Sequence, residues 1–118
     1  MTTAEELMTD PTVIRWLRSA GFSTETPAEQ LAQVRMLASF CNHEGKTPQE
    51  ILDTCLLQKT DDGQYEISIK GRRLVNAAID EFATTLGLSK HYEIAAGNSI
   101  RGFLVHNGVL IQGKPSVP

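Results

Sequence analysis

Four polar residues near the C-terminal end of the chain have the types and spacing of a binding surface. They are Lys90, His91, Asn98 and Arg101, and helical periodicity places them on one side of a helix. Lysine and arginine bind phosphate, while histidine and asparagine contact phosphate or the edge of a base. We expect these side chains to contact nucleic acid; the alternative is an ordinary solvated helix face.

Three further groups of polar residues are weaker candidates for the same contact. Ser89 would begin the helix that carries Lys90, and unpaired backbone amides at a helix start attract phosphate. Two other helix starts add candidates, although the role of Thr26 is predicted to be that of a helix cap first. These candidates are Thr26, Gln30 and Gln33 in one helix and Lys70, Arg72 and Arg73 in another.

No arrangement of residues predicts catalysis, a metal or a cofactor. Tyr65 and Tyr92 lack a neighbouring group that would activate a nucleophile, and the chain has neither a glycine-rich phosphate loop nor a Gly-x-Ser-x-Gly motif. Cys41 and Cys55 stand without a histidine pair, so no zinc site is expected. We expect both cysteines to be buried free thiols.

The length and composition predict one domain of a cytoplasmic protein. The chain has 118 residues, which is enough for a core without disulfides or metals. It contains neither a membrane-spanning run nor the basic, apolar start of a signal peptide. We expect a flexible N-terminal segment over residues 1–10, a helical domain over residues 11–111 and the start of a linker over residues 112–118.

The elements that would position the candidate residues are five helices with short connections. Capping residues, prolines and glycines mark their ends. They are predicted at Pro11–Ala20, from Thr26 to the Asn42–Lys46 segment, from Thr47 to about Leu56, from Ser68 to Leu86, and from Ser89 to Asn107. Lys59–Glu66 is predicted as an exposed loop. The fold class is therefore all-α, a compact bundle of four to five helices.

Apolar residues at helical spacing predict which side of each helix faces the core. In the fourth helix this side contains Leu74, Val75, Ile79 and Phe82 among others, with Arg73, Asn76 and Asp80 opposite. In the last helix the predicted core residues are Tyr92, Ala96, Ile100, Phe103 and Leu104.

Net charge argues mildly against nucleic-acid binding, because the whole chain carries −3. The charge is uneven: residues 1–59 are net acidic, whereas residues 67–118 are net basic. A basic face on an acidic molecule therefore remains an open interpretation.

Three stretches in succession resemble one known family. They are Val13–Leu17 with Ser23–Thr26 and the helix to Phe40, then Gly45–Leu52, then Gly87–His91 continuing through Ser99–Phe103 to Asn107–Val109. This order is similar to the N-terminal core-binding domain of tyrosine recombinases, the phage integrase family, especially its archaeal-type members. Tyr92 and Gly97 depart from the family pattern.

The resemblance implies a SAM-like helical bundle that binds one side of double-stranded DNA through its second and final long helices. A separate catalytic domain of the same parent chain would bind the other side and exchange strands, and copies would self-associate on DNA. The family cuts DNA with a tyrosine and a His-x-x-Arg motif, and none of the three histidines here has that arginine. We therefore expect no enzymatic activity from this chain alone.

Two alternatives to DNA binding as a recombinase domain stay open. One is a helical protein–protein interaction module without a DNA role, which the net negative charge favours. The other is a small helix-turn-helix regulator, which the Leu86–Ser89 turn permits and the long flanking helices fit poorly.

Overall fold

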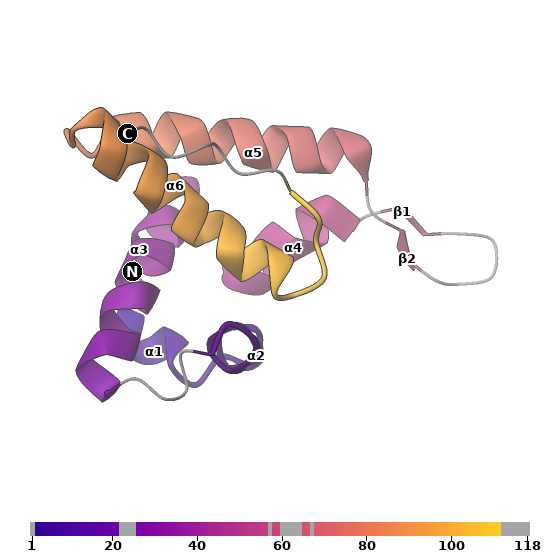
Figure 1. Ribbon diagram of the computed structural model, residues 1–118. Helices are drawn as coiled ribbons and strands as arrows, with labels where there is room; N and C mark the ends of the chain where they lie inside the picture. Colours follow the sequence, from indigo (N-terminus) through magenta and orange to yellow (C-terminus); the bar gives the residue numbers. More distant parts are fainter. Residues whose placement is uncertain (1, 22–25, 57, 60–64, 67, 112–118) are drawn as a thin grey trace.

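The computed structural model describes residues 2–21, 26–56, 58–59, 65–66 and 68–111, and within them the chain forms an all-α bundle (Figure 1). The helices are α1 (Ala4–Leu7), α2 (Pro11–Ser19), α3 (Pro27–Glu44), α4 (Pro48–Leu56), α5 (Ile69–Thr84) and α6 (Lys90–Val105). Two short strands, β1 (Gln58–Lys59) and β2 (Tyr65–Glu66), pair antiparallel. The all-α prediction is confirmed.

The capping signals in the sequence form the helix starts that they predict. Thr26 accepts a hydrogen bond from the amide of Glu29 while the Glu29 carboxylate accepts one from the amide of Thr26. Thr47 and Glu50 make the same reciprocal pair before α4. These bonds satisfy amides that the first helical turn leaves without partners. Gly45 ends α3 in the left-handed conformation, with φ of 66°.

Two of the predicted boundaries differ from the structure. In the segment predicted to be flexible, residues 2–10 contain α1, whose Ala4 and Leu7 belong to the core, and Thr2 is hydrogen-bonded to Asn42. The predicted loop at Lys59–Glu66 begins and ends in paired strands; residues 60–64 and the predicted linker at 112–118 lie outside the described residues.

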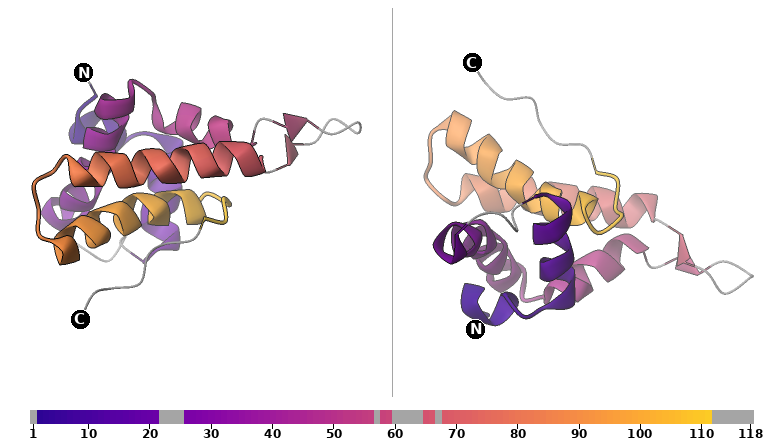
Figure 2. Two further views of the ribbon diagram at one scale, coloured as in Figure 1. Left: turned by 90° about the horizontal axis from the view of Figure 1, so that it is seen from above. Right: turned by 60° about the horizontal axis from the view of Figure 1, so that its bottom comes forward.

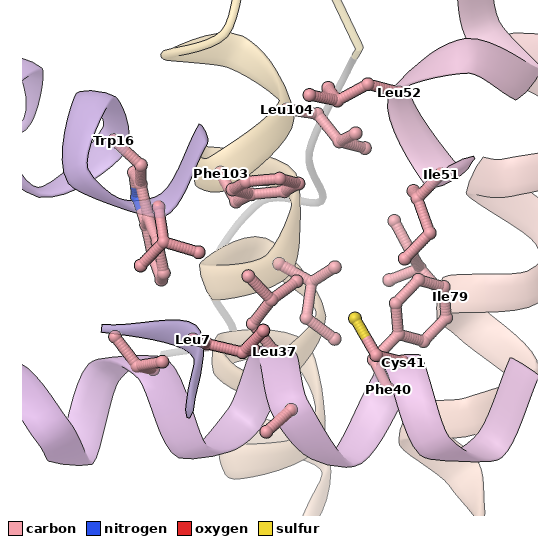
Figure 3. Packing of buried hydrophobic residues seen from close by; sticks show 14 of the residues in the cluster. Leu7, Trp16, Leu37, Phe40, Cys41, Ile51, Leu52, Ile79, Phe103 and Leu104 are labelled. Atoms are coloured by element: carbon pink, nitrogen blue, oxygen red, sulfur yellow. The ribbon is translucent and has the colours of Figure 1, made fainter. Parts of the chain in front are cut away.

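The core lies where α1, α2, α3, α4, α5 and α6 meet (Figure 3). Trp16 of α2 packs edge-on against Phe103 of α6 with ring centroids 5.8 Å apart, and Phe40 of α3 packs against Phe82 of α5 at 5.5 Å. Aromatic pairs of this geometry add to the hydrophobic gain from burial. Cys41 and Cys55 are buried free thiols, as predicted.

The helix pair α5 and α6 forms one layer of the molecule, with α6 returning beside α5 after a short turn at Gly87 (Figure 1). Seen from above, α4 and α6 lie on either side of α5 (Figure 2). Asn107, just after α6, fastens the end of this helix to α2: its amide donates to the carbonyl of Thr12, and its oxygen accepts from Arg15. Val109 then enters the core.

Candidate nucleic-acid interface

Arg101 is buried, so the prediction that it faces solvent is wrong. The residue is 3 % exposed, and each guanidinium nitrogen has a partner. Nη2 donates to Asp80 at 2.8 Å, Nε to Asn76 at 2.7 Å and Nη1 to Asn98 at 3.2 Å. The charge is therefore neutralised between α5 and α6, because α6 packs against α5 over a wider arc than its apolar stripe indicates.

Gly97 leaves the space that the Arg101 side chain occupies. A Cβ at this position would lie 3.0 Å from Nη1 of Arg101 and 3.4 Å from Cγ2 of Ile79. The departure from the family pattern at Gly97 is thus explained by close packing between α5 and α6. Helical spacing puts Asn76 and Asp80 on the same side of α5 but does not identify them as partners of Arg101.

Two of the four predicted contact residues, Lys90 and His91, lie exposed at the start of α6. Lys90 is 64 % exposed at its side chain and lies 3.0 Å from the Glu93 carboxylate. His91 is exposed, with its ring edge-on to Tyr92 at 5.3 Å. Ser89 occupies the N-cap position, but its side chain makes no capping hydrogen bond. Lys90 also lines a small hollow between α5 and α6 together with Asp80 and the buried Arg101, which donates to Asn98.

Tyr92 is 63 % exposed and Leu74 is 58 % exposed, so the predictions that both lie in the core are wrong. Leu74 directly precedes the buried Val75, and Tyr92 lies one helical turn before the buried Ala96. The other predicted core residues of α6 are buried: Ala96, Ile100, Phe103 and Leu104.

A shallow hollow of about 300 Å³ lies between α3 and α6. It brings Gln33, one of the predicted contact residues, together with Tyr92 and Ser99 of α6. The hollow is lined by Ala32, Gln33, Met36, Leu88, Tyr92, Ala95, Ala96 and Ser99. Most of the surface exposed in it is apolar, and Gln33, Tyr92 and Ser99 are the lining residues with polar side-chain groups. This is the surface that we call the α3/α6 surface.

The other two predicted contact residues at α3 are Thr26 and Gln30. Thr26 caps the helix through its hydroxyl, as predicted. Gln30 is half-buried, one turn before Gln33 on the same helix. Ser99 was not among the predicted contact residues, although it directly follows Asn98 in α6.

The basic residues at the start of α5 do not join Lys90 in one strip. Lys70 and Arg73 are exposed, and Arg72 donates from Nη1 to the carbonyl of Leu110 at 2.8 Å. Because α6 returns beside α5, the starts of the two helices lie at opposite ends of the pair (Figure 1). A helix of this length spans about 24 Å, so the two basic groups form separate surfaces.

Within the described residues, no group of three or more histidine, cysteine, aspartate or glutamate side chains could hold a metal ion. The same part of the chain contains no helix that is both long and apolar enough to cross a membrane. No protein-family model, no curated protein and no solved structure matches this chain.

Proposed function

We propose that this chain is a module that binds double-stranded DNA, of the core-binding type that its sequence resembles in tyrosine recombinases, and that it does so through the start of α6 and the neighbouring α3/α6 surface. The observation that carries the proposal is the start of α6, where Ser89 leaves the first-turn amides without a side-chain cap beside the exposed Lys90 and His91. In a recombinase, a separate catalytic domain in the cytoplasm would exchange the strands.

Helix starts of this kind bind phosphate, because backbone amides and the helix dipole both favour an anion there. The caps before α2, α3, α4 and α5 are filled by the side chains of Asp10, Thr26, Thr47 and Ser68. At α6 a phosphate oxygen would take the place of the missing cap. Gln33 and Ser99, across the hollow, would supply side-chain hydrogen bonds to the backbone or a base edge.

Packing accounts for several residues in the third of the three stretches that carry the resemblance. Arg101 is held by Asp80, Phe103 lies in the core and Asn107 fastens α6 to α2. Gly108 adopts φ of 90°, and Val109 is completely buried. These residues therefore have structural roles, whereas Ser89, Lys90, His91 and Ser99 of the same stretch are the proposed contacts with DNA.

The test is a titration of a fluorescently labelled duplex at low salt, read by anisotropy. We expect weak binding by the wild type, in the non-specific range of about 10⁻⁴ to 10⁻⁶ M. Lys90→Ala and Gln33→Ala should each weaken it, by about threefold to tenfold for the lysine.

The matched control is Lys46→Ala, which removes the same charge from the connection between α3 and α4. It should bind as the wild type does. Equal losses in Lys90→Ala and Lys46→Ala would show that only net charge matters, and absence of binding by the wild type at low salt would contradict the proposal.

A protein–protein interaction module is the second candidate, and one observation favours it. Leu88 and Tyr92 are 43 % and 63 % exposed over the half-buried Met36, which is an apolar surface that a partner helix could cover. Binding of that kind would hardly respond to salt, whereas DNA binding would weaken steeply.

A further inference from the structure

The segment that follows α6 returns to the start of α5 and encloses a hollow against it. Val109 is buried, and its amide bonds to the carbonyl of Leu104 at 2.9 Å. The carbonyl of Leu110 then accepts a hydrogen bond from Nη1 of Arg72 at 2.8 Å. The open hollow between this segment and α5 has a volume of about 260 Å³. It is lined by Ile69, Arg72, Arg73, Asn76, Leu110 and Ile111.

The guanidinium of Arg72 is only partly satisfied by the protein. Nη1 bonds to a neutral carbonyl, whereas Nε is buried and has no hydrogen-bond partner within the described residues. Arg73 is exposed, and neither arginine forms an ion pair with a carboxylate in that part of the chain. Arg101 differs in both respects, because each of its nitrogens has a partner and one partner is the Asp80 carboxylate. Two uncompensated positive charges and a buried donor without a partner favour an anion in this hollow.

Large apolar side chains surround these two arginines. Ile69 is 59 % exposed and Leu110 is 69 % exposed, and Ile111 is half-buried beside them. A phosphate backbone of DNA would leave these side chains in contact with water. A peptide can instead present a carboxylate and apolar side chains together, so the lining favours a peptide over nucleic acid.

We propose that this hollow binds an acidic side chain of a peptide whose neighbouring residues are apolar. Arginine offers a fork of donors that matches a carboxylate, and an anion between Arg72 and Arg73 would balance both charges. The apolar neighbours in the peptide would cover Ile69 and Leu110. Ser68 already caps the start of α5 with its hydroxyl, so the arginine side chains carry the site and the helix amides do not.

The hollow lies apart from the α3/α6 surface. The residues that line the two do not overlap, and the starts of α5 and α6 lie at opposite ends of the helix pair (Figure 1). The inference is therefore independent of DNA binding, and either can fail without the other.

The test is a titration of the isotopically labelled full chain with the peptide acetyl-Leu-Glu-Leu-amide up to about 10 mM, followed by heteronuclear NMR. We expect saturable shifts of the Arg72 Nε–H signal and of the Ile111 amide. The same peptide with glutamine in place of glutamate should bind about tenfold more weakly, because it lacks the charge. Inorganic phosphate should also bind more weakly than the glutamate peptide, because it covers no apolar side chain.

Arg73→Gln should weaken binding of the peptide by about threefold or more, and Ile69→Ala should also weaken it. Lys70→Gln is the matched control, since Lys70 is an exposed cation on the same turn of α5 but does not line the hollow. It should bind the peptide as the wild type does, and circular dichroism checks that the variants are folded.

Three results would overturn the proposal. They are the absence of a saturable shift, equal binding of the glutamate and glutamine peptides, and equal losses in Lys70→Gln and Arg73→Gln. A duplex that displaces the peptide and shifts the same signals at lower concentration would assign the hollow to nucleic acid instead.

Discussion

Arg101 illustrates how a charged residue in an otherwise clear pattern changes its role once it is buried. A buried guanidinium is tolerated only when its hydrogen-bonding groups are satisfied and its charge is balanced. Asn76, Asn98 and Asp80 meet both conditions. Asp80 itself is 40 % exposed at its side chain, whereas Arg101 is 3 % exposed. Water can solvate the charge of Asp80, but the charge of Arg101 depends on its protein partners.

This asymmetry leads to the first prediction. Asp80→Ala leaves a buried cation without a counter-ion and should lower the free energy of unfolding by about 3 kcal/mol, measured by urea denaturation followed at 222 nm. Glu81→Ala, on the exposed side of α5, is the control and should change stability by less than about 0.5 kcal/mol. Similar midpoints for the two variants would mean that the ion pair contributes little.

The two thiols make a second prediction at this scale, on pH. Burial raises the pKa of Cys41 to about 12 and that of Cys55 to about 11, from 9.0. Above pH 9 the unfolded chain loses these protons while the folded chain keeps them, so ionisation favours unfolding. Ionisation of the two thiols should therefore leave the free energy of unfolding unchanged below pH 9 and lower it as the pH rises towards 11.

Denaturation curves at pH 8, 9 and 10 measure this effect. A variant with Cys41→Ala and Cys55→Ala should show a smaller decrease over the same range, after correction for its lower starting stability. An identical decrease in both proteins would assign the pH dependence to other groups.

At the scale of the elements, glycines decide how closely the helices approach. Gly71 lies on the Thr54 carbonyl of α4, whereas Gly102 has ordinary space, since a Cβ there would lie 3.6 Å from Nε1 of Trp16. Both residues are in helices and both carry the same cost in helix propensity relative to alanine. They therefore form a matched pair that separates packing from propensity.

Gly71→Ala should destabilise the fold by about 2 kcal/mol or more, because the backbones of α4 and α5 must move apart. Gly102→Ala should be neutral or stabilising by up to about 1 kcal/mol, from its gain in helix propensity. Thermal unfolding of both variants makes the comparison. A Gly71→Ala variant as stable as Gly102→Ala would show that the α4/α5 crossing is adjustable.

At the scale of the whole molecule, the fold divides the basic residues into groups that cannot act together. Lys90 and His91 stand at one end of the α5/α6 pair and Lys70 to Arg73 at the other, while Arg101 is neutralised between the helices. These basic residues of α5 and α6 therefore do not form one continuous cationic strip, and the whole chain carries −3. The contact with DNA that we propose would accordingly be local.

A shallow salt dependence follows from this distribution. Binding through Lys90 and His91 neutralises one or two phosphates, so the logarithm of the binding constant should fall with the logarithm of salt concentration with a slope between about −1 and −2. Titrations at four salt concentrations give the slope. A slope of about −4 or steeper would mean that Lys70, Arg72 and Arg73 also contact the duplex.

All the helices except α1, and most of their ends, could be predicted from the sequence, because the signals that set them are local. Thr26 with Glu29, Thr47 with Glu50 and glycines such as Gly45 act within a few residues of the helix end that they define. Most of the core residues follow from helical periodicity for the same reason, as do the buried thiols.

Which arc of each helix is covered was decided only by the tertiary structure. Arg101 turned inward while Leu74 and Tyr92 turned outward, although the pattern along each helix indicates the reverse. The burial of these three depends on where α5 and α6 cross each other and on contacts with α3 and α4, which lie far away in sequence. A residue at the edge of an apolar stripe is covered or exposed according to its neighbour's position, and periodicity within one helix carries no information about that position.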